Sequence, residues 1–308
     1  MSLARSILLR ASKSRFLADQ VSHRRFVRRA VRRFMPGESP EEALDAGLRL
    51  AAEGRGTVFT KLGENLSSLA DAEAVRDHYL WFFDQVAARR VPGHVSVKPT
   101  QLGLDLSPER CAEYCETLAQ KAESTGTLFC IDMEDSSYVD RTIALYRGLR
   151  AKHDKVGICL QAYLRRTPAD LEALLPIAPT IRLVKGAYAE PADVAFPSKR
   201  DTDGAFYDLS VRMLEAAAQG KCLPIFGTHD VSLLRRLVDN ARELAVPDGA
   251  YEIHMLYGIR DGDQQQLRAQ GRTVRTLISY GASWFPWYMR RLAERPANVW
   301  FVMKSMVG

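Results

Sequence analysis

The sequence contains no apolar run that approaches the roughly 18 residues a helix needs to span a membrane. It has only five cysteines, and these lie in apolar runs without the paired spacing of a metal site or a disulfide framework. We therefore expect no metal and predict reduced thiols in the core of a cytoplasmic protein. No Gly-x-Gly-x-x-Gly follows the first predicted strand, which argues against a Rossmann nucleotide site.

Acidic residues are nearly absent from the first part of the chain. Asp19 is the single acid among many Lys and Arg residues between Arg5 and Arg33, although the formal net charge of the whole chain is only +6. Because no basic face with interleaved aromatics continues beyond this arm, nucleic acid is not an expected partner. Apolar residues recur at helical spacing as far as Phe34. We favour a helix that packs on the body of the protein, and the alternatives are a transit peptide or peripheral contact with the inner membrane.

After this arm, short β-branched or aromatic runs alternate with helical stretches. Two of these stretches start with Ser-Pro-Glu, at Ser39 and Ser107, where serine suits the N-cap and proline the first turn. The eight runs that predict strands are residues 57–62, 94–98, 127–131, 156–160, 180–184, 222–226, 251–255 and 273–278. Eight strand–helix units in about 250 residues predict an α/β fold, a (βα)8 TIM-like barrel preceded by N-terminal helices. A doubly wound sheet is the alternative.

The domain prediction follows from this pattern. We expect residues 1–50 to form a helical arm that packs on the barrel. Residues 51–308 are expected to form the catalytic barrel, with a C-terminal helix that carries Arg290 and Arg291. These adjacent arginines suit a carboxylate or phosphate clamp, and a solvated helix face is the alternative interpretation.

Side chains able to do chemistry follow nearly every predicted strand, where barrel enzymes place their active sites. This concentration favours an enzyme. The most informative strand ends with two cations, Arg182 and Lys185, directly before Gly186. Burying two positive charges without an anion is costly, so we expect a phosphorylated cofactor or a carboxylate substrate there. A solvated strand end is the other interpretation.

Several short segments occur in the order found in the FAD-dependent proline dehydrogenases. They are Leu62-Gly63-Glu64, Asp132-Met133-Glu134, Tyr163-Leu164-Arg165-Arg166-Thr167, Arg182-Leu183-Val184-Lys185-Gly186-Ala187-Tyr188, Thr228-His229, His254-Met255-Leu256-Tyr257-Gly258 and Arg290-Arg291-Leu292-Ala293-Glu294. Over about residues 40 to 300 the chain resembles the monofunctional bacterial type of this family. The resemblance implies a distorted (βα)8 barrel and FAD as cofactor. It also implies oxidation of L-proline to 1-pyrroline-5-carboxylate by hydride transfer to the flavin, with electrons passed to a quinone.

The resemblance also implies roles for particular residues. The substrate site would comprise Lys98, Arg290 and Arg291 on the carboxylate, together with Leu256 and Tyr188. The FAD site would comprise Met133, Gln161, Arg182, Lys185, Gly186, Ala187, Thr228, His229 and Glu294. Asp132 and Arg182 would be the catalytic residues, with Asp132 fixing the cations around the flavin. Glu64 would pair with Arg290 as a gate.

Some positions depart from the family pattern. Leu277 and Trp287 stand where the family commonly has tyrosine, and His254 stands where glutamine is usual. Tyr280 is an alternative source of an aromatic ring near the substrate. Oxidation of 4-hydroxyproline or another cyclic imino acid is therefore the alternative activity. From a different class, a Schiff-base aldolase that uses Lys185 is the rival interpretation, and a non-catalytic barrel that binds partners is the third.

Overall fold

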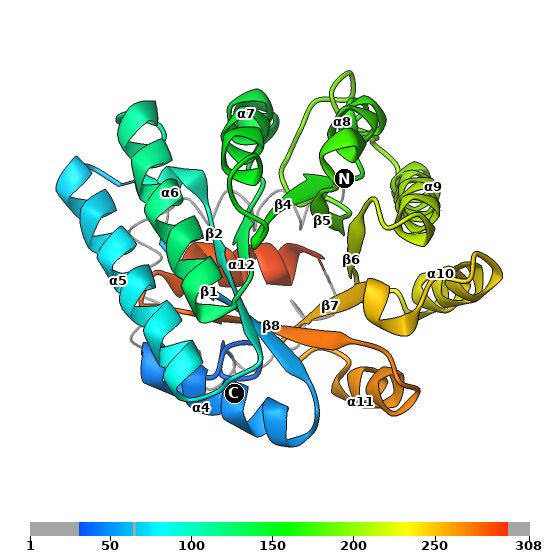
Figure 1. Cartoon of the computed structure of the whole chain (residues 1–308), viewed down its shortest axis with the longest axis horizontal. Helices are drawn as coiled ribbons and strands as arrows, with labels where there is room; N and C mark the ends of the chain where they lie inside the picture. The colour runs from blue at the N-terminus through cyan, green and yellow to red at the C-terminus, as the bar shows by residue number, and fades with distance from the viewer. Residues whose placement is uncertain (1–30, 64–65, 295–308) are drawn as a thin grey trace, which may run out of the picture.

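The barrel predicted from the sequence is present. The computed structural model describes residues 31–63 and 66–294, of which residues 290–294 are described by their backbone alone. Eight parallel strands pair in chain order, and β8 pairs with β1 to close the barrel (Figure 1). They are β1 (Gly56–Lys61), β2 (Gly93–Val97), β3 (Phe129–Ile131), β4 (Val156–Gln161), β5 (Thr180–Val184), β6 (Leu223–Gly227), β7 (Glu252–Leu256) and β8 (Val274–Tyr280). The predicted strand bounds differ from these by at most two residues.

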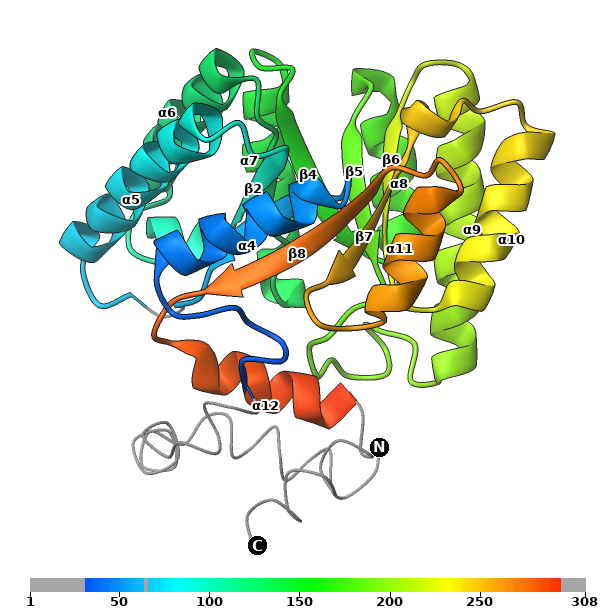
Figure 2. The ribbon, with the colours of Figure 1, turned by 90° about the horizontal axis from the view of Figure 1, so that it is seen from below.

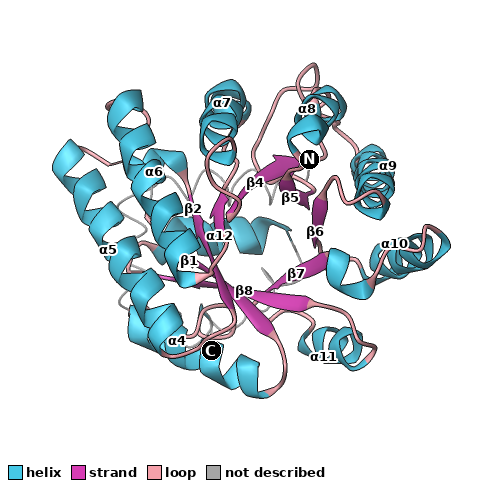
Figure 3. Ribbon diagram, in the orientation of Figure 1, coloured by secondary structure: helices cyan, strands magenta, loops and turns pink. Residues whose placement is uncertain are grey.

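Helices surround the strands on the outside of the barrel (Figure 3). They are α4 (Pro40–Ala52), α5 (Leu69–Ala88), α6 (Pro108–Thr125), α7 (Val139–Arg150), α8 (Thr167–Leu174), α9 (Lys199–Ala218), α10 (Val231–Glu243) and α11 (Asp261–Ala269). A last helix, α12 (Trp284–Glu294), follows β8. Short 3-10 turns lie at η1 (Pro99–Leu102), η2 (Ser136–Tyr138), η3 (Leu175–Ile177) and η4 (Asp248–Ala250). Among the residues that the structure describes, none of these helices combines the length and apolarity needed to cross a membrane.

The helix starts predicted from Ser-Pro-Glu are confirmed. Ser39 caps α4, with its side chain accepting from the backbone N–H of Glu42 while the Glu42 side chain accepts from the N–H of Ser39. Ser107 caps α6 by accepting from the N–H of Arg110. Each cap satisfies N–H groups that a helix end would otherwise leave unpaired.

Two helices lie outside the regular alternation of strand and helix. Helix α4, which precedes β1, packs against both β1 and β8. Gly47 allows this close approach, since a Cβ there would lie 2.7 Å from Cζ of Phe59. Helix α12, which follows β8, lies instead across the C-terminal end of the barrel (Figure 2). Val31 and Met35, from the described end of the predicted arm, pack with the buried Trp284 of α12.

The core lies between the strands and the outer helices. Phe59 of β1 packs edge-on against Phe82 of α5, with ring centroids 5.1 Å apart. All five cysteines are buried and none of them is paired in a disulfide, so the predicted placement of the cysteines in the core is confirmed.

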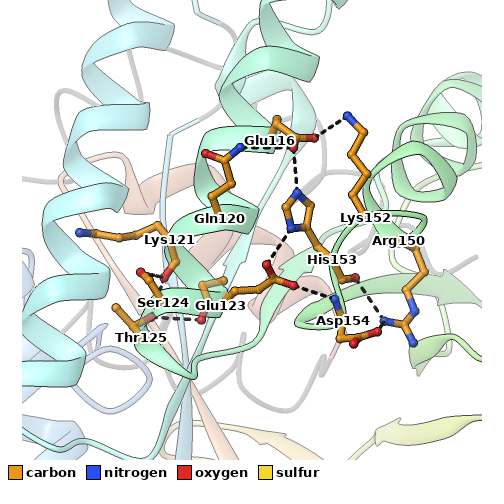
Figure 4. A network of polar contacts seen from close by, with 11 residues as sticks. Glu116, Gln120, Lys121, Glu123, Ser124, Thr125, Arg150, Lys152, His153 and Asp154 are labelled. Atoms are coloured by element: carbon orange, nitrogen blue, oxygen red, sulfur yellow. Dashed lines mark hydrogen bonds and ion pairs between the residues drawn. The ribbon is translucent and has the colours of Figure 1, made fainter.

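A network of charged groups joins the end of α6 to the loop before β4 (Figure 4). The ring of His153 contacts Glu123 through Nδ1 at 2.9 Å and Glu116 through Nε2 at 2.8 Å. Burial would lower the pKa of His153, but its hydrogen bonds to Glu123 and Glu116 outweigh burial and raise it. This network lies at the end of the barrel where the strands begin, opposite their C-terminal ends.

Candidate active site

A cavity of about 420 Å³ opens at the C-terminal end of the barrel. Its lining includes residues in or directly after each of the eight strands, and Trp287 of α12 covers one side. The volume falls within the range of small-molecule sites, about 300–1,000 Å³. The cavity therefore lies where the barrel architecture predicts an active site.

The structure brings most of the predicted site residues to this single cavity. Those that line it are Lys98, Asp132, Met133, Gln161, Arg182, Lys185, Gly186, Ala187, Tyr188, Thr228, His229 and Leu256. Glu64 lies outside the described residues. Arg290, Arg291 and Glu294 belong to α12, and their side chains also lie outside the description.

Arg182 is the most buried cation of the cavity. Its side chain is 4% exposed and forms an ion pair with Asp132, whose side chain is 15% exposed. Arg182 Nη2 also donates to Ser96 Oγ at 3.0 Å, and the Ser96 hydroxyl donates to Asp132 Oδ1 at 2.7 Å. A solvated strand end is therefore the wrong interpretation of Arg182. The carboxylate supplies the counter-charge that a buried guanidinium requires.

Lys185 enters the same cavity because the strand ends one residue earlier. Gly186 has a φ of +112°, and a Cβ at this position would lie 2.1 Å from the ring of Tyr163. The turn therefore requires glycine. Lys185 Nζ donates to Asp203 Oδ1 of α9 at 2.5 Å and lies 3.4 Å from Asp230 Oδ2.

Asp230 is ionised and also caps α10. Burial would raise its pKa, but hydrogen bonds from the Ser232 hydroxyl and the Leu233 N–H, together with Lys185, lower it to about 2. The Asp230 N–H in turn donates to Thr228 Oγ1 at 3.2 Å. One carboxylate thus fixes the helix start, the loop after β6 and the position of Lys185.

His229 ties the end of β6 to β7. The N–H of Leu256 donates to His229 Nε2 at 2.9 Å. Because Nε2 accepts, the proton of the neutral ring lies on Nδ1.

The two positions that depart from the family pattern, Leu277 and Trp287, both line the cavity. Tyr280 is not among the residues that line it, so the alternative in which Tyr280 supplies a ring near the substrate is wrong. It lies on the outer side of β8, stacked on Phe82 at 5.1 Å between centroids, with its hydroxyl 2.9 Å from His78 Nε2. The alternation of side chains along a strand places Leu277 inward and Tyr280 outward.

Sequence reasoning gave no site role to His254 and Ser279, which also line the cavity. Each carries a buried polar atom with no hydrogen-bond partner among the described residues, and so do two of the predicted cofactor residues. These atoms are His254 Nδ1, Ser279 Oγ, Gln161 Oε1 and Arg182 Nη1. The sequence did contain a pattern that indicates both residues. Side chains alternate between the two faces of a strand, so His254 lies on the same face as Leu256 and Ser279 on the same face as Leu277.

Comparison with known proteins identifies the family. The model of the proline dehydrogenase family matches residues 43–304. The chain belongs to the proline dehydrogenase family. It is 35% identical over 280 residues to proline dehydrogenase 1 of Bacillus subtilis subsp. natto, covering 91% of each chain. It is 34% identical over 284 residues to a proline dehydrogenase of Deinococcus radiodurans, covering 89% of each.

Solved structures of this kind share the fold. The chain superposes on proline utilization A from Bdellovibrio bacteriovorus, inactivated by N-propargylglycine, with a TM-score of 0.78 and 24% identity. The match covers 85% of this chain and 32% of that much longer one. The likeness is thus between this barrel and one part of a larger protein.

Proposed function

We propose that this protein oxidises L-proline to 1-pyrroline-5-carboxylate with FAD as cofactor and a quinone as electron acceptor, as the first step of proline catabolism. The observation that carries the proposal is the buried Arg182–Asp132 pair at the floor of a cavity that Lys98 and Lys185 also line. Family membership supplies the reaction class, and these cations supply the means to bind anionic groups.

The residues present fit a flavin. Arg182 Nη1 and Gln161 Oε1 are a donor and an acceptor that line the cavity and have no partner in the described part of the chain. Flavin rings offer both hydrogen-bond acceptors and a donor along one edge. Residues that would hold FAD are Met133, Gln161, Arg182, Lys185, Gly186, Ala187, Thr228 and His229, with Glu294 proposed from the sequence. When bound, FAD supplies the hydride acceptor.

Protein groups position the substrate and stabilise charge. Lys98 would bind the carboxylate of proline together with Arg290 and Arg291, while Leu256 and Tyr188 would contact the ring. Holding the carboxylate orients the ring carbon that loses hydride. Arg182, kept in place by Asp132, would stabilise negative charge that develops on the cofactor.

Closure of the site is also proposed. Trp287 of α12 covers the cavity, which helps exclude water from the reacting atoms. Glu64 would act as a gate by pairing with Arg290 until substrate arrives. The basic N-terminal arm would give peripheral contact with a membrane that contains the quinone.

The aldolase alternative is less consistent with the site. Lys185 Nζ contacts the carboxylates of Asp203 and Asp230, and these two ion pairs direct it toward α9 and the start of α10 rather than toward a carbonyl substrate. The alternative substrate, 4-hydroxyproline, is retained because Ser279 lines the same cavity as Leu277 and its hydroxyl has no hydrogen-bond partner among the described residues.

The test is a visible spectrum of the purified protein before and after anaerobic addition of L-proline. We expect a flavin spectrum, released on heating as FAD because no covalent attachment motif is present, and bleaching by proline. Mass spectrometry should find the oxidised product, and a quinone should restore the colour. A colourless protein that borohydride inactivates together with a carbonyl substrate would support the aldolase instead.

A further inference from the structure

A second polar cluster lies inside the barrel below the cavity, and none of the roles proposed above uses it. It comprises His94 of β2, Glu252 and His254 of β7, and Arg275 of β8. Oε2 of Glu252 lies 3.1 Å from His94 Nε2, 2.9 Å from His254 Nε2 and 2.8 Å from Arg275 Nε. One carboxylate oxygen therefore gathers three side chains from three strands.

The cluster has the composition of a metal site but not the charge balance of one. Ligand atoms of His94, Glu252 and His254 lie within 4.8 Å of one another. However, Arg275 already neutralises the carboxylate. A divalent cation would add two buried positive charges without a counter-ion, which is strongly unfavourable. The geometry points to a hydrogen-bonded network.

This network determines where the proton of His254 lies. Burial would raise the pKa of Glu252, but His94, His254 and Arg275 hold it well below its usual range, so the group is an ionised carboxylate that only accepts. Burial lowers the pKa of His254 to about 3, so its ring is neutral. The single proton must then lie on Nε2, which donates to Glu252, and Nδ1 carries a lone pair.

His254 connects this network to the cavity, whose wall it lines. Strand β2 contacts both the network and the cavity residues. His94 and Ser96 are two residues apart on this strand, so both face the barrel interior, about 6.6 Å from each other along the strand. His94 packs beside His254, with ring centroids 6.0 Å apart, whereas Ser96 accepts from Arg182. Arg182 of β5 and His254 of β7 both line the cavity, and only β6 lies between their strands.

Strand β6 carries a glycine between them. Gly227 pairs in register with both Val184 and His254, and a Cβ there would lie 2.8 Å from Cγ1 of Val184 and 3.8 Å from Cγ of Arg182. Within the described residues, Arg182 Nη1 is a buried donor without a partner and His254 Nδ1 is a buried acceptor without one. Two such groups in one cavity complement each other, because unpaired buried polar groups are rare and costly.

We propose that His254 is a positioning residue, in which Glu252 fixes the tautomer that leaves Nδ1 unprotonated. A water molecule would then bridge this nitrogen to one of the two hydrogens on Arg182 Nη1, and the other hydrogen stays available to the cavity. This contact holds the guanidinium in the orientation that it presents to the cavity. The functional part rests on the proposed role of Arg182 beside the flavin, whereas the tautomer of His254 does not depend on it.

The first experiment measures the tautomer in the full-length protein labelled with 15N-histidine. The imidazole resonances of His254 are assigned by their loss in His254→Gln. Between about pH 6 and pH 8 we expect Nε2 to be protonated and Nδ1 to be unprotonated. In Glu252→Gln, whose amide can donate, we expect a proton to appear on Nδ1. A protonated Nδ1 in the natural protein, or a bound transition metal on the ring, would overturn the proposal.

The second experiment compares His254→Gln with His254→Leu. Glutamine keeps a donor for Glu252 and an acceptor for Arg182, and we expect its kcat with proline to stay within about threefold of the natural value. Leucine removes the acceptor, and losing one hydrogen bond to a charged group should lower kcat about ten- to hundredfold. The KM for proline should change less than about threefold in both, because His254 is not assigned to the substrate.

The matched control is His153→Gln, which also removes a histidine from contact with glutamates but lies away from the cavity. It should keep natural kcat and KM. Equal impairment of the glutamine and leucine variants of His254, or natural kcat in the leucine variant, would refute the positioning role. If the natural protein does not oxidise proline, the proposed function is wrong. The tautomer measurement still tests whether Glu252 fixes the proton of His254 on Nε2.

Discussion

Asp132→Ala is the substitution that most directly tests the buried ion pair. It leaves the guanidinium of Arg182, at 4% exposure, with Ser96 as its remaining described partner. Removing one member of a buried pair costs about 3–5 kcal/mol, because the other charge stays buried without compensation. Asp132 is 15% exposed and water can partly replace it, so we expect the lower end, about 3 kcal/mol of unfolding free energy.

The assay is urea unfolding of the purified protein, read as a shift in midpoint at constant m-value. Glu113→Ala is the control, since Glu113 pairs with Arg110 on the surface at 60% and 53% exposure and should contribute less than about 1 kcal/mol. Adding Arg182→Met to Asp132→Ala should restore part of the loss, because no unpaired charge then remains. A loss below about 1 kcal/mol for Asp132→Ala would refute this account of the pair.

Three further predictions concern substrate, specificity and pH. Arg291→Met should raise the KM for proline about ten- to hundredfold and leave the flavin content unchanged, because the variant loses a charge-assisted hydrogen bond to the substrate carboxylate. An unchanged KM would show that Arg291 is not part of the substrate site. Leu277→Tyr should lower kcat/KM for trans-4-hydroxyproline more than for proline by filling the cavity that Leu277 lines; an unaltered ratio contradicts this placement. The raised pKa of His153 means that its stabilisation is full below its unfolded pKa of about 6.5 and is lost as pH rises through the folded value. The stability difference between the natural protein and His153→Gln should therefore shrink with rising pH in urea unfolding, and a constant difference would show that the ring is uncharged.

Local patterns were sufficient to predict the barrel. The apolar run at residues 180–184 coincides with β5, and Ser39 and Ser107 begin helices as their sequence context predicts. These features depend on neighbours in sequence, which is why they can be read from it. The positions of α4 and α12 depend on packing between distant segments, such as Gly47 against Phe59. No local signal specifies them.

The candidate site also has parts that the sequence predicts and parts that it does not. Strand ends identify Asp132, Gln161 and Arg182 because a parallel barrel gathers its C-terminal strand ends at one face. The turn that follows Lys185 requires the positive φ of Gly186, which the sequence indicates only as the presence of a glycine. The network around Glu252 joins residues separated by as many as 158 positions, and a single sequence does not reveal such pairings.

The charged layer below the cavity is not explained by stability alone. Replacing a buried ionic cluster by apolar side chains of similar volume is often neutral or stabilising, and apolar residues are the usual filling of a barrel interior. Glu252 nevertheless gathers His94, His254 and Arg275 at hydrogen-bond distances, and His254 Nδ1 stays without a partner among the described residues of the cavity that Arg182 also lines. An apolar layer would pack as well but would remove the acceptor that we propose for the water-mediated contact with Arg182 Nη1. The arrangement is thus better understood as support for the cavity above it than as part of the core.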